Sequence, residues 1–428
     1  MRKKHLGTLT VVAALALSAA TTSGVAARTT TDYNAQTSPL PPETQVVQLA
    51  EQYLRDRDQG WLEPGEQASP HLAAHQIGAQ PASVSSGIAQ IAAELAEERG
   101  LRASEVRTGF LPGADVQIDP ERASVTTTSV TSLTWNDDEL GESMLSDRYR
   151  LDIVRASGDW HIEKVTYVDP PTTEESARQS TATEQAETER SSVDMPAEPA
   201  AEPPHQFQTV SYDREAAAAY ARTWSIIDHS PGATPRYNRD YHHVWFDEDE
   251  YPDYDSVNDC TNFASQMLVA GGWPKVPGLW PGNVENWTDA LSWPSPYRAS
   301  ETWTVAYMLW RFMTESGRAE AWESGSPAET DAIWDLQPGD VLFADWDPDK
   351  KPDGKIDHAM LISGTYTELG FTEPVYSQHT PHRHNVPLSL GIKIATSEPP
   401  PVDPGNGMGG QGREVDFYPV HVKDSFES

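Results

Sequence analysis

The alternation of apolar and polar residues predicts helices followed by strands in residues 43–168. A helix over 43–57 has its apolar residues at helical spacing, namely Val46, Leu49, Ala50, Tyr53 and Leu54. A second helix is expected over 84–99. Residues 123–135 are rich in Val and Thr, and residues 149–162 alternate around a Ser-Gly-Asp turn, as in a hairpin. This order of elements predicts a small α+β domain over 43–168.

A change of composition separates this segment from the rest of the chain. Residues 169–207 are rich in Pro, Glu, Thr, Ser and Ala and have almost no large apolar side chains. Such a segment cannot bury enough surface to offset the entropy lost on ordering. We therefore predict a disordered acidic linker. The alternative, a helix through 174–190, would lack an apolar face.

The pattern in residues 208–424 again places helices before strands. A helix is expected from Asp213 to about Ile227, and residues 397–414 are expected to be a loop. The predicted strands cover residues 340–345, 358–363, 374–379 and 415–422. Helices followed by an antiparallel sheet predict a second α+β domain over 208–424.

The first residues have the pattern of an export signal. Three basic residues, Arg2, Lys3 and Lys4, precede an apolar run of about a dozen residues, and Val25-Ala26-Ala27 forms a small-residue cleavage site. A spanning helix needs about 20 apolar residues, so this shorter run indicates a signal peptide that is removed. After its removal we expect no membrane span. We expect a signal peptide over 1–27, a flexible lead over 28–42, and a secreted protein that is extracellular and associated with the cell wall.

The net charge and the cysteine content limit the classes of function that the chain can have. The 428 residues carry a formal net charge of −34, which disfavours nucleic acid as a partner because phosphate backbones are repelled. The chain has one cysteine, Cys260, so no disulfide within it is possible. A lone thiol kept in an oxidising compartment suggests a use. The alternative is a small buried core residue.

The surroundings of Cys260 predict a nucleophile at the start of a helix. Asn258 or Asp259 can cap the helix, and Gly271-Gly272 can end it. A thiol in the first turn meets unpaired N–H groups and the positive end of the helix dipole, which favour the reactive thiolate. The charge of Asp259 opposes this effect, so a histidine partner is needed.

Histidines on the predicted strands are candidate partners. His358 begins a strand and can act as general base and then as general acid toward the leaving amine. A third residue should orient its imidazole. His379 is the first candidate, and Asn385, Gln378 and Asp357 are its rivals. Asp357 is the weaker because successive residues of a strand face opposite sides.

Other patterns do not predict a metal or a cofactor. The acidic residues over 347–357 lack the spacing of a calcium loop, and His242-His243 lacks the spacing of a helical zinc site. We therefore expect no bound metal and no cofactor. Five tryptophans can line a groove or lie in the core: Trp273, Trp280, Trp287, Trp293 and Trp303.

The second segment resembles the putative amidase domain family of exported bacterial proteins, which is related to papain-like cell-wall peptidases. The resemblance covers most of 210–395. The stretches that carry it are Tyr212-Asp213-Arg214, Asp259-Cys260-Thr261-Asn262-Phe263-x-Ser265-Gln266, Gly271-Gly272, Pro338-Gly339-Asp340, Asp357-His358 and Ser377-Gln378-His379-Thr380. The resemblance implies a papain-like fold, with a helix-borne cysteine packed on an antiparallel sheet. It also implies Cys260 as nucleophile, His358 as base and His379 as third residue.

These observations predict a secreted cysteine-dependent amidase or peptidase. It would hydrolyse an amide bond of a peptide or peptidoglycan substrate through a thioester acyl-enzyme. One alternative is a catalytically idle extracellular binding protein with two modules on a flexible linker. A calcium-dependent adhesion protein is another. The sequence predicts neither the scissile bond nor an oligomeric state.

Overall fold

The computed structural model describes most of the two predicted α+β segments. The residues described are 40–62, 80–168, 208–227, 236–244, 259–291, 299–346, 352–396 and 414–427. The predicted signal peptide, the lead as far as residue 39, the linker and the loop up to residue 413 lie outside these ranges. Within them, no helix is both long and apolar enough to cross a membrane.

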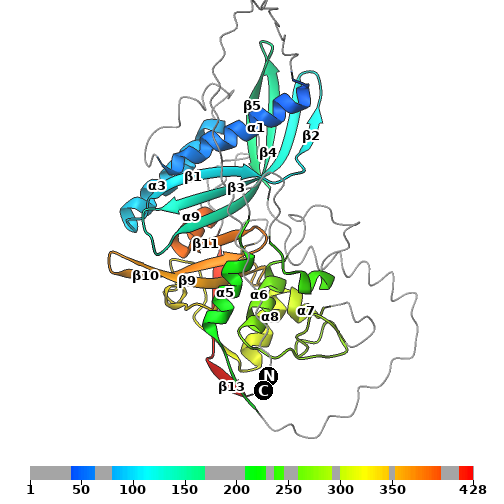
Figure 1. The fold of residues 1–428 in the computed structure, drawn as a ribbon, viewed down its shortest axis with the longest axis vertical. Coiled ribbons are helices and arrows are strands. Elements are labelled where there is room, and N and C mark those ends of the chain that lie inside the picture. The colour runs from blue at the N-terminus through cyan, green and yellow to red at the C-terminus, as the bar shows by residue number, and fades with distance from the viewer. Residues whose placement is uncertain are drawn as a thin grey trace, which may run out of the picture. The chain divides into compact units, whose positions relative to one another are not determined.

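The first segment folds as its pattern predicts, with helices before strands (Figure 1). Its elements are α1 (Pro42–Asp58), η1 (Gln59–Trp61), α3 (Gln80–Glu98), β1 (Ala103–Phe110), β2 (Asp115–Ile118), β3 (Arg122–Trp135), β4 (Glu142–Ala156) and β5 (Asp159–Tyr167). The apolar face of α1 packs on alternate residues of β3 and β4 and on Ile162 and Val165 of β5. Ser157 and Gly158, with φ of 55° and 99°, make the turn between β4 and β5. Positive φ at both positions suits a two-residue hairpin turn.

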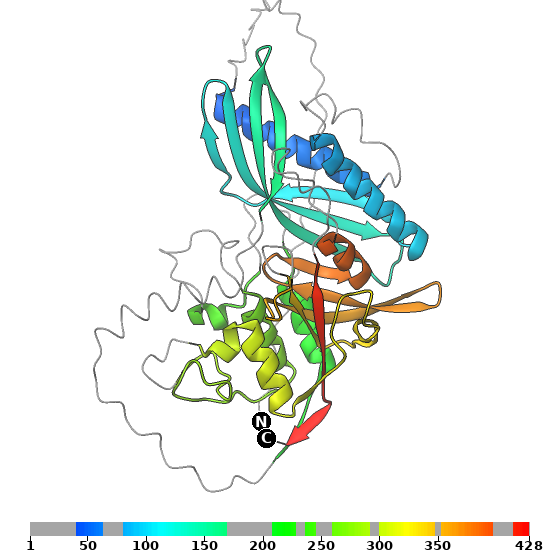
Figure 2. The same cartoon turned by 180° about the vertical axis from the view of Figure 1, so that it is seen from behind.

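The second segment begins with helices that precede its sheet. They are α5 (Arg214–Trp224), η2 (Arg239–Val244), α6 (Cys260–Ala270), α7 (Glu301–Thr304) and α8 (Ala306–Glu315). The elements that follow are β7 (Ala319–Ala321), η4 (Ala332–Asp335), β8 (Val341–Asp345), β9 (His358–Glu368), β10 (Phe371–Gln378), β11 (Arg383–Pro387), α9 (Leu388–Thr396) and β12 (Asp416–Val422). A separate ribbon pairs β6 (Thr209–Ser211) with β13 (Ser425–Glu427). Figure 2 shows β12 and β13 from behind, in red.

One eleven-stranded sheet contains strands of both segments, in the order β1-β3-β4-β11-β10-β9-β8-β12-β7, with β2 beside β3 and β5 beside β4. The strand pairs among the described residues are antiparallel. The two segments meet where β11 pairs with β4, with Arg383 opposite Leu145 and His384 opposite Met144. Helices with an antiparallel sheet confirm the predicted α+β class.

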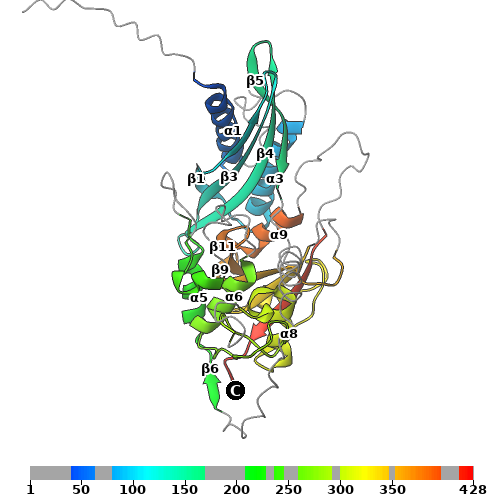
Figure 3. The same cartoon turned by 90° about the vertical axis from the view of Figure 1, so that its right-hand side faces the viewer.

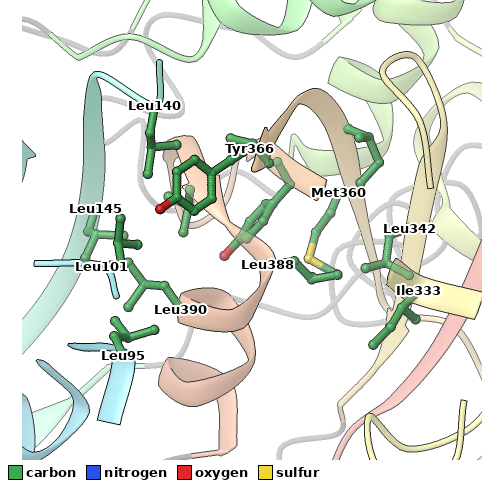
Figure 4. Close-up of a cluster of buried hydrophobic side chains, with 14 of the residues drawn as sticks. Leu95, Leu101, Leu140, Leu145, Ile333, Leu342, Met360, Tyr366, Leu388 and Leu390 are labelled. Carbon is green, nitrogen blue, oxygen red and sulfur yellow. The ribbon is translucent and has the colours of Figure 1, made fainter. Parts of the chain in front are cut away.

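The two faces of this sheet pack against different layers. On β9, Ala359 and Leu361 face the core shared with α5, α6 and α8. Met360 and Ile362 face the other side, where the core includes α9 and residues of the first segment. Figure 3 shows α9 and the pair α5 and α6 at different levels of the fold. In Figure 4, Leu95, Leu101 and Leu145 of the first segment approach Leu388 and Leu390.

The Pro-Gly-Asp motif has a structural role at the start of β8. Asp340 is fully buried, and its carboxylate accepts hydrogen bonds from four donors: Arg214 Nη1, His421 Nδ1 and the backbone N–H groups of Gln337 and Val422. Gly339 has φ of 88°, and its carbonyl accepts a 2.7 Å bond from the Tyr212 hydroxyl. A buried carboxylate with this many donors fixes the start of β8.

Candidate functional site

Cys260 is the first residue of α6, as the sequence predicts. Asp259 is the N-cap, but its side chain makes no capping bond to the helix. The thiol is fully buried, and α6 packs on β9 and β10. The sulfur contacts the Thr261 hydroxyl at 3.5 Å and the backbone N–H of Ala359. That N–H belongs to the peptide that joins Ala359 to His358, so the sulfur lies beside the start of β9.

Burial controls the ionisation of the thiol. It raises the pKa of Cys260 to about 11, and the negative charge of Asp259 acts in the same direction. The Thr261 hydroxyl and the backbone N–H groups of Ala359 and Thr261 lower the pKa, but by less. The favourable position at the helix start is therefore outweighed, and the resting group is a neutral thiol.

The polar residues that follow Cys260 hold α6 against its neighbours. Asn262 donates to Asp259 Oδ1 at 2.6 Å and accepts from the Trp303 indole at 2.6 Å. Ser265 accepts from the Trp287 indole at 3.0 Å, and Gln266 accepts from the Tyr220 hydroxyl at 2.6 Å. The polar pattern after the cysteine thus serves to place the helix.

His358 is the first residue of β9 and is buried. Its ring stacks on Trp346, with the ring centroids 4.6 Å apart. Burial lowers the pKa of His358 to about 3, while a hydrogen-bonding interaction with the Gln378 side chain acts in the opposite direction. The imidazole is therefore neutral near pH 7.

Gln378 lies on β10, next to the strand that begins with His358, and the two side chains have complementary hydrogen-bonding groups. His358 Nε2 and Gln378 Oε1 are both buried without a hydrogen-bond partner among the described residues. The amide nitrogen of Gln378 donates to the Pro381 carbonyl at 2.9 Å, which leaves its oxygen as an acceptor. A proton on Nε2 would satisfy both atoms and leave Nδ1 as the basic nitrogen. Catalytic hydrogen bonds are often long in unliganded structures.

His379 contacts Asp259, the residue before the cysteine. Its Nδ1 lies 2.6 Å from Asp259 Oδ2, and its Nε2 lies 3.0 Å from the Trp224 carbonyl. The ring also stacks flat on Phe263, with the centroids 3.8 Å apart. Both neighbours of the ring nitrogens are acceptor oxygens. His379 therefore lies against the carboxylate of the residue that precedes the thiol.

The other residues considered for orienting His358 have separate roles. Asn385 Nδ2 donates to the Leu140 carbonyl at 2.6 Å, in the first segment. Asp357 accepts from the backbone N–H of Trp346 at 3.3 Å. Of the four candidates, Gln378 is the one with an interaction at His358. Asn258, a proposed cap, lies outside the described residues.

Two further histidines, His382 and His384, follow His379 in the chain. The ring of His382 is 4.5 Å from that of His379, and its Nε2 has no hydrogen-bond partner among the described residues. Burial, followed by the positive charges of His379 and Arg383, holds its pKa well below the usual value. His384 Nδ1 lies 2.7 Å from the Ser225 hydroxyl, and burial lowers the pKa of His384 to about 4.

The candidate metal-binding patterns and the tryptophans have structural roles where the structure describes them. No group of three or more metal-ligating side chains occurs within the described ranges. Asp345 accepts from the backbone N–H groups of Asp353 and Gly354, so this carboxylate closes a loop. Three tryptophans belong to the core, namely Trp273, Trp287 and Trp303, whereas Trp280 is exposed and Trp293 lies outside the described residues.

Two contacts of the site have no signal in the sequence. Trp346 stacks on His358, and Thr380 Oγ1 accepts the backbone N–H of Asp259 at 3.0 Å. The alternation of strand faces indicates only that the neighbours Gln378 and His379 point to opposite sides, and does not indicate which of them meets His358.

The charge of Asp259 leads to a prediction for the thiol. Asp259→Asn removes a negative charge that raises the pKa of Cys260, so the thiolate fraction at pH 8.5 should rise about threefold to tenfold. His379→Gln leaves that charge without its partner and should lower the thiolate fraction. The rate of alkylation by iodoacetamide, measured against pH, reports both effects.

A matched control for this prediction is Asp152→Asn. Asp152 lies on β4 and pairs with Arg150 on the same strand. Its replacement should leave the alkylation profile unchanged. Equal profiles for Asp259→Asn and the parent chain would show that this carboxylate does not control the thiol.

The fold and site define an α+β domain in which a helix-borne cysteine lies beside a strand that begins with histidine. Residues 211–398 match the family described as "Putative amidase domain". This match confirms the resemblance expected from the sequence and supports an amidase-like hydrolase.

Curated proteins and solved structures give no activity for the chain. No curated protein matches the chain. Among solved structures, Aln2 from a Streptomyces species is 16% identical, with 30% of this chain and 91% of that chain covered and a TM-score of 0.22. The Kfla4162 protein from Kribbella flavida is 14% identical, with 30% and 92% covered and a TM-score of 0.23. Neither similarity defines an activity.

Proposed function

We propose that the chain is a secreted cysteine-dependent amidase of papain-like type that hydrolyses an amide bond in cell-wall peptide. The observation that carries this proposal is the contact of the Cys260 sulfur with the backbone N–H of Ala359, at the start of the strand that begins with His358. The match of residues 211–398 to an amidase family supports the reaction class. The substrate class and the export rest on the sequence pattern and the resemblance.

The ionisation of the two groups favours a general-base mechanism. The thiol and the imidazole are both neutral at rest, so no ion pair is formed in advance. As the sulfur attacks the carbonyl carbon, His358 Nδ1 takes the thiol proton. His358 then gives this proton to the nitrogen of the leaving amine as the C–N bond breaks, which leaves a thioester on Cys260.

Hydrolysis of the thioester completes the cycle. His358 Nδ1 takes a proton from water, the water oxygen bonds to the acyl carbon, and the C–S bond breaks. The proton returns to the sulfur, and the product is a carboxylic acid. Because Cys260 is fully buried, substrate can reach the sulfur only after the surrounding chain moves.

The buried thiol is also the observation that favours an alternative function. A catalytically idle binding protein would have an unreactive cysteine, and a fully buried thiol with a raised pKa fits that description. The test must therefore detect chemistry at Cys260 rather than exposure of the thiol.

Mass spectrometry of the full chain with peptidoglycan peptides separates the two functions. For the amidase, we expect new amine and carboxylate ends in the peptides and, after acid quenching, an acyl adduct on the peptide that contains Cys260. Cys260→Ser should lose the thioester adduct. Intact substrate together with unmodified Cys260 would reject the amidase and favour the binding protein.

A further inference from the structure

The segment Gln378–Asn385, called the turn below, comprises the last residue of β10, the connection over 379–382 and the first three residues of β11. It carries several contacts of the candidate site. At its start, Gln378 interacts with His358, and His379 bonds to Asp259. Thr380 Oγ1 accepts the backbone N–H of Asp259 at 3.0 Å, so the turn also holds the residue before the nucleophile. A shift of this turn would therefore change the surroundings of the base and of the thiol together.

The far end of the same turn is held by β4 of the first segment. The backbone N–H of Ser146 donates to the His382 carbonyl at 2.9 Å. The Arg383 guanidinium donates to the Ser146 carbonyl at 2.6 Å and to Asp147 Oδ1 at 2.5 Å. Arg383 is buried, so this ion pair lies largely out of water.

Further bonds join the end of the turn to the loop before β4. Asn385 has φ of 53°, and its side-chain nitrogen donates to the Leu140 carbonyl at 2.6 Å. The Ser143 hydroxyl donates to the Asn385 carbonyl at 2.6 Å. Contacts within the second segment also hold the turn: the Ser225 hydroxyl lies 2.7 Å from His384 Nδ1, and the Ser377 hydroxyl accepts the backbone N–H of Asn385 at 3.0 Å. The first segment therefore supplies part of its support.

We infer that the first segment is an intramolecular positioning partner of the candidate site, in which β4 and Asp147 hold the turn Gln378–Asn385 in its working conformation. The catalytic part of this inference rests on the proposed function. Without β4, β11 would be an edge strand with unpaired backbone groups, and Arg383 would be a buried charge without its carboxylate. The segment over 43–168 thereby gains a role that no motif within it suggests.

Substitutions at the ion pair test this inference in the full chain. Asp147→Asn and Arg383→Lys weaken the link while keeping the shape of the side chain or its charge. We expect kcat for peptide hydrolysis to fall about tenfold to a hundredfold, because small displacements of catalytic groups have effects of this size. KM should stay within about twofold, because the substitutions displace the base and do not remove a contact to substrate.

A second measurement does not depend on catalysis. The nitrogen signals of the His379 imidazole, observed by NMR with labelled histidine, should shift in both variants. Near-UV circular dichroism shows whether each variant is folded. Asp147→Glu keeps the carboxylate and should recover most of the activity, and Asp152→Asn, on the exposed part of β4, should match the parent chain.

The outcomes are distinct. Folded Asp147→Asn and Arg383→Lys variants with the kcat and His379 signals of the parent chain would overturn the inference. So would an equal loss of kcat in Asp152→Asn. If the parent chain itself hydrolyses nothing, the proposed function fails, while the His379 signals still decide whether β4 controls the turn.

Discussion

Replacing His358 by alanine is expected to slow peptide hydrolysis by about a thousandfold. The proposed mechanism uses this imidazole twice, to remove the thiol proton and to protonate the leaving amine. A positioned acid–base group typically contributes a factor of about 10² to 10⁴. The thiol, with a pKa of about 11, is almost entirely protonated at pH 7.5, so loss of the base is not offset by a preformed thiolate. The measurement is kcat/KM for release of the amine.

Two further variants test whether the loss of kcat is specific to His358. Gln378→Ala should reduce kcat less than His358→Ala does, because it removes only the acceptor that would orient Nε2. His161→Gln is the matched control, since His161 is a histidine of β5 in the first segment. A His358→Ala variant that keeps kcat within a few-fold of the parent would exclude His358 as the base.

The dependence of kcat/KM on pH provides an independent check of the resting state. Because His358 has a pKa of about 3 and Cys260 about 11, both stay neutral between pH 6.5 and 9. The profile should be flat over that range. An acid limb with a midpoint near pH 6.5 would indicate an imidazole with its ordinary pKa and would contradict the neutral pair.

Local sequence signals predicted much of this fold because they depend on nearby residues. The helix that begins at Cys260 ends before Gly271-Gly272, and His358 begins a strand, as the pattern of apolar residues indicates. The helix α9 was not expected from the sequence, although it follows β11 directly. Its residues Ile392 and Ile394 suit a strand by propensity.

Tertiary contacts explain why that segment is helical. Glu373 of β10 accepts from the backbone N–H and the hydroxyl of Ser389, at the start of α9. A Cβ at Gly391 would lie 2.5 Å from the Tyr376 ring, so the helix packs closely on β10. Neither contact can be read from neighbouring residues. The pairing of β11 with β4 likewise joins residues more than two hundred positions apart.

Which residue lies beside His358 also depends on contacts that are distant in the sequence. Gln378 and His379 were both candidates to orient His358, and nothing in the local pattern ranked the two strand faces. In the structure, Gln378 lies with His358, whereas His379 stacks on Phe263 of α6. The assignment depends on the register of β10 against β9, which only long-range pairing sets.

Mild acid is expected to destabilise the protein strongly, because buried neutral histidines resist protonation only in the folded state. Burial lowers the pKa of His358 to about 3 and that of His384 to about 4, and it also lowers the pKa of His382. In the unfolded chain each would titrate near pH 6.5. Between pH 6.5 and the folded pKa values, the unfolded state binds more protons, so stability falls as pH falls.

The size of this effect is large relative to the stability of a typical domain. Each such histidine costs about 1.4 kcal/mol per pH unit below pH 6.5, so three cost about 4 kcal/mol at pH 5.5. Total stabilities are typically about 5 to 15 kcal/mol. Burial raises the pKa of Glu373, and this carboxyl acts in the opposite direction, because its folded form takes up a proton as pH falls.

Urea unfolding at pH 7.5, 6.5 and 5.5 measures the slope. The unfolding free energy should change little between the first two values and fall steeply toward the third. His384→Gln removes one titrating group and keeps a polar atom near the Ser225 hydroxyl. Its slope should be smaller by about one proton, or about 1.4 kcal/mol per pH unit. A free energy that does not change from pH 7.5 to 5.5 would mean that these histidines reach solvent in the folded protein. The lowered pKa of His358 would then be wrong as well.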